Sequence, residues 1–446
     1  MYKFKPALLG LLFASYNLAA QSPGGISHQS FWLQEKQSPN QKQQTLNFNS
    51  FINLAENKGS IKLPGNIRSM RRITVFTVYQ NTSDVESPVW QVSGGVGDLS
   101  LSNKQISSTS GKSTLLFVKN KPANEAILHT YIGNTGMAPS SGDGSALTTG
   151  NVKLAEFILY ERILPEQDVA KIETYLALKY GITLQRNYVS ASGNVLWNYK
   201  FDSGYSNNIA GIARDDRSAL YQKQSTSSNA AGQLVIGAYK MNDRDYLIWG
   251  DNSQPLTIND GIFASKKWLM KRAGDKADKI STGLKIDANS ILSAFPKDSF
   301  YLVIDRTGTG EFSNDCVYLK PDNITEEGIA SFNDVHWDVD GSGKDAFTFA
   351  VKPPTRLVKE DAVKLTGFQL YPNPVRGGRY NMMLTLDKPA DIEIRVYDMH
   401  QKLVHAAKGA GQSSYIFPGQ ITGAAGAYTV RVITPQTEYS RIIIVQ

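Results

Sequence analysis

The sequence contains a single cysteine, Cys316, so it cannot form an internal disulfide. Its five histidines make no zinc-like grouping, and neither the G-x-S-x-G motif of hydrolases nor the H-E-x-x-H motif of metalloproteases occurs. A jelly-roll glycosidase would need two acidic residues on one strand face. Asp243 and Asp245 alternate only in a polar turn, and Glu156 is the one acid of its apolar strand. These absences favour a binding protein over an enzyme.

Dense basic runs and long apolar runs are missing as well. The net charge of +7 is spread along the chain, without the alternation of basic and aromatic residues that is typical of nucleic-acid binding. DNA and RNA are therefore excluded as expected partners. After the N-terminal region no stretch reaches about 18 consecutive apolar residues, so we expect no transmembrane helix in the mature chain.

Residues 1–20 have the pattern of a signal peptide. Lys3 and Lys5 precede a short apolar run, which is followed by small residues up to Ala20. This pattern predicts export. Residues 21–49, which are rich in Gln, Ser and Asn, are expected to be an irregular lead-in.

The rest of the chain is rich in Gly, Ser, Thr, Asn and aromatic residues, while strong helical periodicity is scarce, which favours an all-β architecture. At roughly 100–200 residues per domain, the length suffices for about three domains. The segment 50–186 contains short strands separated by clusters of Gly, Ser, Asn and Pro, a spacing that suits a jelly roll. The expected strands are Arg72–Gln80, Pro88–Val92, Leu99–Leu101, Thr114–Val118 and Ile127–Ile132.

Residues 154–184 carry the clearest structural pattern. The apolar run 154–160 predicts a strand inside a sandwich. A helix is expected to follow, because Pro165 suits a first helical position, acidic residues come next, and Gly181 can adopt the left-handed conformation that ends a helix. Apolar residues recur in this helix at spacings of three and four and form one stripe, which must dock on another element. They are Val169, Ile172, Leu176 and Tyr180.

The segment AEFILYERILPEQDVAKIETYLALKYGITL resembles the end of a concanavalin A-like (LamG-type) jelly-roll domain of secreted Bacteroidetes proteins. The resemblance implies a jelly-roll sandwich with one docked helix over residues 50–186. Lectin-like sandwiches of this kind often bind sugars at loop edges, which makes the loop 133–150 a candidate ligand site. Its ligand-binding residues would be Asn134, Asp143 and Asn151. The alternative is a long Gly- and Ser-rich connection without a ligand.

Residues 187–351 are expected to form a second β domain. This region resembles a β domain of undefined function that follows the jelly roll in the same secreted proteins. The resemblance is carried by the segments YSNNIAGIARDDRSALYQKQS, YLIWGDN and YLVIDRTGTGEF. It implies which domain precedes this one but does not imply an activity. The cluster Arg214-Asp215-Asp216-Arg217 predicts a self-satisfied salt-bridge turn rather than a binding site. The plainest strands are Gln233–Ala238, Asp245–Gly250, Lys267–Lys271, Phe300–Asp305 and Ala346–Val351.

Residues 338–345 resemble the first half of a calcium loop, with oxygen ligands at alternate positions and Gly343 in sixth place. Phe349 stands where the bidentate glutamate would be needed, so the second half does not fit. The alternative is a hairpin turn between two strands. A weaker candidate is the loop 305–311, which has threonines where a strong site would have carboxylates. The predicted metal ligands are Asp338, Asp340, Ser342 and Asp345, and calcium is the one cofactor suggested.

Residues 352–366, with two adjacent prolines and mixed charge, are predicted to be a linker. The following segment, 367–446, has alternating strands and the motifs YPNPV, GAYTVRV and RIIIV. It resembles the type A C-terminal sorting domain of the type IX secretion system, which implies a small immunoglobulin-like β-sandwich that serves as an export address. The alternative is an ordinary immunoglobulin-like accessory module. The residues of the sorting signal would be Tyr371, Pro372, Asn373, Pro374, Gly426 and Tyr428.

Together these patterns predict an exported multidomain β protein, delivered to the cell surface by the type IX secretion machinery. Its expected function is non-enzymatic adhesion or glycan binding, with a glycan or a host surface protein as partner. Two alternatives stay open. One is a polysaccharide-degrading or modifying enzyme with an unrecognised site, and the other is a structural surface or secretion-accessory component.

Overall fold

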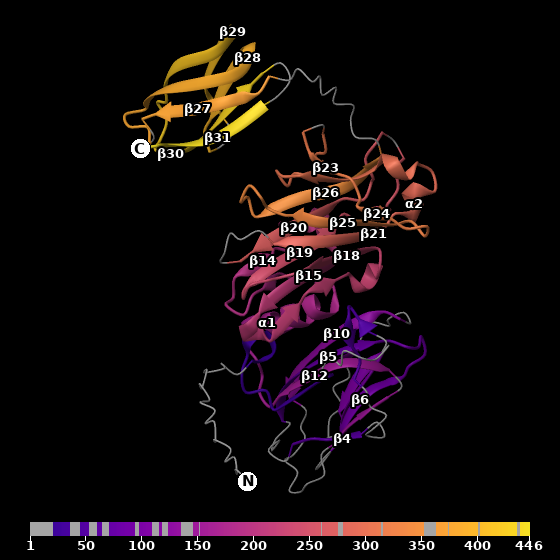
Figure 1. The fold of residues 1–446 in the computed structure, drawn as a ribbon. Helices are drawn as coiled ribbons and strands as arrows, with labels where there is room; N and C mark the ends of the chain where they lie inside the picture. The colour runs from indigo at the N-terminus through magenta and orange to yellow at the C-terminus, as the bar shows by residue number, and fades with distance from the viewer. Residues whose placement is uncertain are drawn as a thin grey trace, which may run out of the picture. The chain divides into compact units, whose positions relative to one another are not determined.

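The computed structural model confirms the all-β fold class, with one long helix among antiparallel sheets (Figure 1). It divides into two compact units, Met1–Pro354 and Thr355–Gln446. Within the part of the chain that the structure describes, no helix is long and apolar enough to span a membrane. The described residues are 21–35, 45–52, 60–64, 71–93, 98–108, 116–117, 124–134, 146–150, 152–259, 261–274, 280–313, 315–351, 363–372, 374–399, 402–434 and 438–446.

The first sandwich of the larger unit has two sheets. One has the order β1 (Phe31–Gln34), β12 (Lys153–Tyr160), β5 (Arg72–Gln80) and β10 (Ala126–Asn134). The other has the order β4 (Ser60–Lys62), β11 (Ala146–Thr149), β6 (Pro88–Ser93), β7 (Asp98–Ser102), β8 (Gln105–Ser108) and β9 (Leu116–Phe117). Apolar side chains from both sheets form the core between them. At its centre, the rings of Trp90 and Phe157 meet edge to face at 5.4 Å.

The second sandwich also has two sheets. The seven-stranded sheet has the order β16 (Leu220–Gln222), β15 (Asn207–Asp215), β19 (Asp245–Asp251), β20 (Trp268–Ala273), β26 (Lys344–Val351), β22 (Phe300–Asp305) and β23 (Val317–Leu319). The five-stranded sheet has the order β17 (Gln224–Ser225), β18 (Leu234–Ala238), β21 (Ser281–Asp287), β25 (Ile329–His336) and β24 (Asn323–Ile324). Stacked rings fill its core, with centroid distances of 5.3 Å for Trp268–Phe347 and for Phe300–Phe349.

Shorter elements complete this unit. The two-stranded pairs are β2 (Thr45–Leu46) with β3 (Asn49–Ser50) and β13 (Tyr188–Val189) with β14 (Val195–Trp197). The short helical turns are η1 (Pro23–Gly25), η3 (Ser203–Tyr205), η4 (Asp216–Ser218), η5 (Ser228–Ala230), α2 (Asn289–Leu292) and η6 (Lys297–Ser299).

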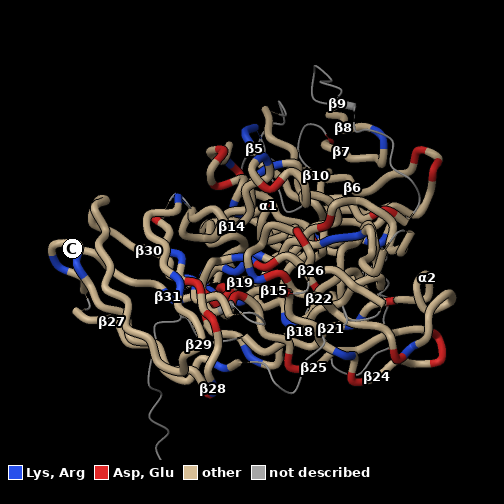
Figure 2. Tube along the Cα trace, turned by 90° about the horizontal axis from the view of Figure 1, so that it is seen from above, with Lys and Arg blue, Asp and Glu red and all other residues tan. Residues whose placement is uncertain are grey.

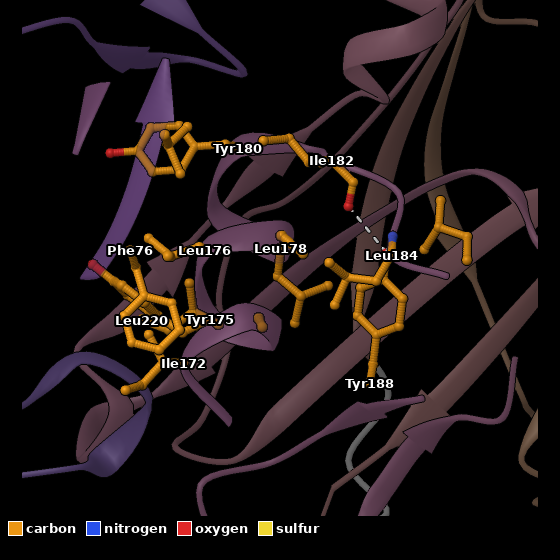
Figure 3. Close-up of a cluster of buried hydrophobic side chains, with 14 of the residues drawn as sticks. Phe76, Ile172, Tyr175, Leu176, Leu178, Tyr180, Ile182, Leu184, Tyr188 and Leu220 are labelled. Carbon is orange, nitrogen blue, oxygen red and sulfur yellow. Dashed lines mark hydrogen bonds between the residues drawn. The ribbon is translucent and has the colours of Figure 1, made fainter. Parts of the chain in front are cut away.

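Helix α1 (Glu166–Tyr180) begins after Pro165, which is the N-cap rather than the first helical residue, and ends at Gly181 in the left-handed conformation. The helix buries more of its surface than the single apolar stripe that the sequence predicts. Tyr175 and Leu178 are buried in addition to the predicted stripe. The helix lies between the four-stranded sheet and the seven-stranded sheet, and one continuous apolar cluster runs from Phe76 of β5 through the helix to Leu220 of β16 (Figures 1 and 3).

The lead-in is more ordered than its composition suggests. Strand β1 pairs with β12, and the β2–β3 hairpin covers the C-terminal end of α1. There the side-chain amides of Asn47 and Asn49 donate to the carbonyl of Lys179 at 3.0 and 2.7 Å, which satisfies a backbone group that the helix cannot pair itself. Near η1, a Cβ on Gly24 would lie 2.7 Å from the Ile172 nitrogen, so glycine is required. These short strands are held in place by segments that are distant in the sequence. The amino-acid composition of the lead-in does not indicate such contacts.

A buried carboxylate joins β12 to α1. The Glu156 side chain has no exposed surface. Its Oε1 accepts hydrogen bonds from Trp32 Nε1 (2.7 Å) and the Tyr175 hydroxyl (2.8 Å). Its Oε2 accepts from Lys179 Nζ (2.7 Å) and the Tyr180 hydroxyl (2.8 Å). Burial, and then the nearby carboxylate, raise the pKa of both tyrosines well above their ordinary value, so both stay protonated donors.

The smaller unit is one curled sheet with the order β27 (Leu365–Tyr371), β28 (Arg379–Tyr397), β30 (Gly426–Ile433) and β31 (Glu438–Val445), while β29 (Leu403–Gln420) pairs with β28. Register shifts between Thr385 and Ile392 interrupt the pairing of β28 with β29. Strand β28 pairs with β27 before these shifts and with β30 after them. The unit encloses its own apolar core, which includes Ile443 and Val445 from the last strand.

A partly buried histidine predicts acid sensitivity of the first sandwich. His129 lies on β10, its Nδ1 has no partner, and burial lowers its pKa from 6.5 to about 4. The unfolded chain therefore binds a proton that the folded chain does not between about pH 6.5 and 4, and stability falls as the pH falls through that window. The expected loss is up to about 3 kcal/mol.

Denaturant unfolding of wild type and His129→Leu at pH 7 and pH 4.5 measures this loss. Asp345, whose pKa is raised by burial to about 6, acts in the opposite direction in the same window, so the difference between the two proteins isolates His129. An equal pH response of both proteins contradicts the assignment.

Candidate functional site

A groove of about 1240 Å³ opens between the N-terminal half of α1, the segment 185–189 and the loop 192–201. It combines aromatic rings with side-chain amides. Phe201 is 83% exposed, and Tyr199 is partly exposed. The lining residues that carry the argument are Gln167, Gln185, Asn187, Asn198, Tyr199 and Phe201.

Side-chain hydrogen bonds fix the loop that carries the two aromatic residues. Asn187 Oδ1 accepts from the Tyr199 backbone N–H at 2.9 Å, and Asn198 Oδ1 accepts from that of Phe201 at 3.0 Å. Asp202, which is buried, accepts from the Asn198 N–H at 3.1 Å and pairs with a lysine of β20 at 2.7 Å. The exposed ring of Phe201 is therefore presented by an ordered backbone.

The charges of the groove are largely paired. Arg186 lies 3.1 Å from Glu173 and 3.3 Å from Glu166. Glu166 is the one carboxylate among the described lining residues. Figure 2 shows basic and acidic positions interspersed along the chain rather than gathered on one element. Exposed rings suit the C–H face of a sugar, and amides suit its hydroxyl groups, because each amide both donates and accepts hydrogen bonds.

The predicted ligand loop is described only in part. Asn134 lies at the exposed end of β10, paired in register with Arg72 of β5. Asp143 and Asn151 lie outside the described residues. The ligand site at 133–150 therefore stays a prediction.

In the Asp338 loop, carboxylates meet basic side chains of the protein itself. Asp338 Oδ1 accepts from the Gly343 N–H at 2.6 Å, and its Oδ2 lies 3.7 Å from Arg272. Asp345, with a side chain of zero exposure, accepts from Arg306 at 2.8 Å and from the Asp338 N–H at 2.6 Å through Oδ2. Its Oδ1 has no partner. The remaining predicted ligands bond locally, since Ser342 donates to Asp340 through its N–H and to a neighbouring carbonyl through its hydroxyl.

The loop is not a hairpin turn, so that alternative is wrong. Strand β25 before it belongs to the five-stranded sheet and β26 after it to the seven-stranded sheet. Among the described residues, no three His, Cys, Asp or Glu side chains gather as a metal site would need. An ion bound through Oδ2 of Asp338 or of Asp345 would have to displace the arginine contacts. Calcium binding by Asp338, Asp340, Ser342 and Asp345 stays a prediction.

Two other polar clusters have their carboxylates bonded by the protein itself. Arg214 donates through Nε and an Nη to both oxygens of Asp216 at 2.9 Å, which confirms that part of the predicted salt-bridge turn. Asp215 instead accepts from the Ala191 N–H, the Ser218 N–H and the Tyr246 hydroxyl, so the cluster is not satisfied by its own four residues. In the loop after β22, Asp305 accepts from N–H and hydroxyl groups of Thr307 and Thr309 and from the Gly310 N–H. Burial alone would raise the pKa of Asp305, but these hydrogen bonds lower it. Neither cluster offers a free ligand site.

The predicted sorting residues are spread over two strands and a turn. Tyr371 ends β27 and is 45% exposed, and Pro372 and Pro374 follow in the turn, with Asn373 outside the described residues. On β30, Gly426 is the first residue, and Tyr428 is buried, with its hydroxyl donating to a carbonyl at 2.7 Å. Tyr428 therefore stabilises the small core, while Tyr371 is accessible.

Residues 168–341 match the model of a domain of unknown function, DUF8202, which begins inside α1 and ends in the Asp338 loop. Two structures of a β-glucuronidase from Parabacteroides merdae, one with glycerol in its active site, are 13% identical and cover 36% of this chain at a TM-score of 0.15. This chain spans 27% of that enzyme's length. The BSP domain of a biofilm associated protein is 8% identical, with 86% of this chain and 77% of that one covered at a TM-score of 0.16. No curated protein matches.

Sequence reasoning missed the groove. Its walls come from the start of α1 and from a loop about thirty residues later, and their proximity follows from the docking of α1 between two sheets. One signal was available. In the polar segment NYKFDSGYSNN, residues 198–208, Tyr199 and Phe201 stand between amides and charges, where no core stripe explains them.

Proposed function

We propose that this chain is an exported cell-surface protein that binds glycans through the α1 groove and is delivered by type IX secretion. The observation that carries the binding proposal is the exposed Phe201 ring, held by an ordered loop opposite side-chain amides. An exposed ring beside side-chain amides offers a sugar both a stacking surface and hydrogen-bond partners. The mixed and paired charges of the groove favour a neutral polysaccharide.

Binding is favoured over hydrolysis by the carboxylates of the groove. Glycoside hydrolysis uses two carboxyl groups about 5–9.5 Å apart, one of them free to give a proton. The described lining provides Glu166, which is paired with Arg186. The third possibility, a structural surface or secretion-accessory component, would leave the groove without a ligand.

Phe201→Ala is expected to lower the affinity for a bound neutral glycan at least tenfold, because the stacking surface is lost. The melting temperature should stay unchanged, since a ring that is 83% exposed contributes little to the core. A glycan array followed by calorimetry on the full mature chain measures both quantities.

Phe48→Ala is the matched control, because Phe48 is a 41% exposed aromatic residue of the same unit that does not line this groove. An unchanged affinity of Phe201→Ala contradicts the groove as the site. Release of shortened sugars would support the enzyme alternative, and the absence of any glycan ligand would support the structural one.

A further inference from the structure

A second hollow, of about 330 Å³, lies on the outer face of the five-stranded sheet. Alternate residues of β18 and β21, such as Ile236 and Leu284, point into the core, so their neighbours face outward. The lining residues that carry the argument are Lys223, Gln224, Gly237, Tyr239, Gly283 and Lys285. This volume is at the small end of the range of ligand pockets, ~300–1,000 Å³, and suits one terminal sugar unit.

Two glycines form the floor of this hollow. Gly237 of β18 and Gly283 of β21 are direct cross-strand partners in the register of the sheet. Neither has a positive φ, and an added Cβ would lie no nearer than 3.5 Å to other atoms at Gly237 and 3.9 Å at Gly283. Neither backbone geometry nor packing therefore requires glycine here. Glycine inside a strand weakens the strand and often marks a place where a ligand approaches closely.

The walls combine one aromatic ring with groups that form hydrogen bonds. Tyr239 follows β18 and is 73% exposed. Gln224 is the cross-strand neighbour of Gly237 on the other side, and Ser331 and Asn333 of β25 continue the row beyond β21. A sugar ring on the glycine floor would have a stacking partner and several hydroxyl partners.

The charges of the walls are positive. Lys223 and Lys285 line the hollow, and its described lining includes no Asp or Glu. Lys223 Nζ lies 4.9 Å from the centre of the Tyr221 ring. Asp334, on the bulge beside Asn333, is engaged by Ser281 at 2.7 Å and by His336 at 3.1 Å. Two lysines and no carboxylate therefore belong to the described lining of the hollow.

We propose that this hollow is a second binding site, for a sugar unit that carries a carboxylate, a uronic acid. The sugar ring lies over Gly237 and Gly283 and stacks on Tyr239, and its carboxylate is bound by Lys285 and Lys223. The proposal does not depend on the α1 groove, because the two hollows share no lining residue.

The experiment is calorimetric titration of the full mature chain with hexagalacturonate, with its methyl ester as the uncharged comparison. The acid should bind saturably, more weakly as salt increases, and the ester at least tenfold more weakly than the acid. Tyr239→Ala and Lys285→Gln should each lower the affinity at least tenfold.

Gly237→Val separates a binding role from a structural one. Valine favours a strand and the hollow has room for it, so the melting temperature should stay the same or rise. The binding of hexagalacturonate should nevertheless be lost, because the floor is filled. Phe201→Ala should bind the acid as wild type does.

Four results would overturn the proposal. Three of them are no saturable binding at millimolar hexagalacturonate, equal affinity for acid and ester, and wild-type affinity of Gly237→Val. Loss of binding in Phe201→Ala alone would place the acidic sugar in the α1 groove and overturn the second site without touching the first.

Discussion

Replacing Lys179 by methionine is expected to lower the free energy of unfolding by about 3 kcal/mol, because it leaves the buried Glu156 carboxylate without its cation. The two charged groups are 2.7 Å apart, and the Glu156 side chain has no exposed surface. Trp32, Tyr175 and Tyr180 would still donate hydrogen bonds, but they are neutral. Denaturant unfolding of the full chain at pH 7 measures the loss.

Lys171→Met is the matched control on the same helix. Lys171 lies 3.9 Å from Asp168 in a partly exposed pair, which is expected to contribute less than about 1 kcal/mol. The double variant Glu156→Gln and Lys179→Met removes both charges and should recover most of the stability. A loss at Lys179→Met no larger than that of the control would show that the ion pair does not hold helix and sheet together.

Deletion of residues 368–446 is expected to leave the larger unit folded but held in the periplasm. The smaller unit has its own core, and the division between the units falls at Pro354, so the larger one keeps its core after the deletion. Under the proposed export route, the signal peptide carries the chain across the inner membrane and the C-terminal unit directs it across the outer one. Cell fractionation with surface protease treatment shows where the shortened chain resides.

Removal of residues 439–446 alone should block export nearly as well. These residues form most of β31, which contributes Ile443 and Val445 to the small core and pairs with β30 along its length. Without them, the edge of β30 and part of the core become exposed. If the unit is the proposed sorting domain and is cleaved off at the surface, the surface form should end near 352–366. Either shortened chain reaching the surface would make this unit an ordinary module.

The sequence predicted the features that depend on neighbours along the chain. A continuous apolar run identified β12, and the flanking turn residues marked β5 as a strand; both are buried on both faces. Pro165 and Gly181 marked the ends of α1 within one residue. Glu156 shows the limit of that reasoning. It is the one acid of its strand, yet its partners come from β1 and from the helix.

Features built from distant segments were not predictable in this way. The second buried side of α1 packs on residues near Leu220 and Ile248, which follow the helix by forty residues or more. The Gly237–Gly283 floor depends on a strand register that no local pattern specifies. The same holds for the Asp338 loop, where an Asp-Gly turn joins two sheets rather than two paired strands.

The position of α1 between two sheets has a mechanical consequence. Under the proposed glycan binding, a ligand in the groove at its N-terminal half would pull on a helix whose apolar side chains are packed into both sandwiches at once. The load would then reach both cores, because one apolar cluster runs from Phe76 through the helix to Leu220. If the protein holds a cell to a polysaccharide as proposed, the helix would be a mechanical anchor that both sandwiches share.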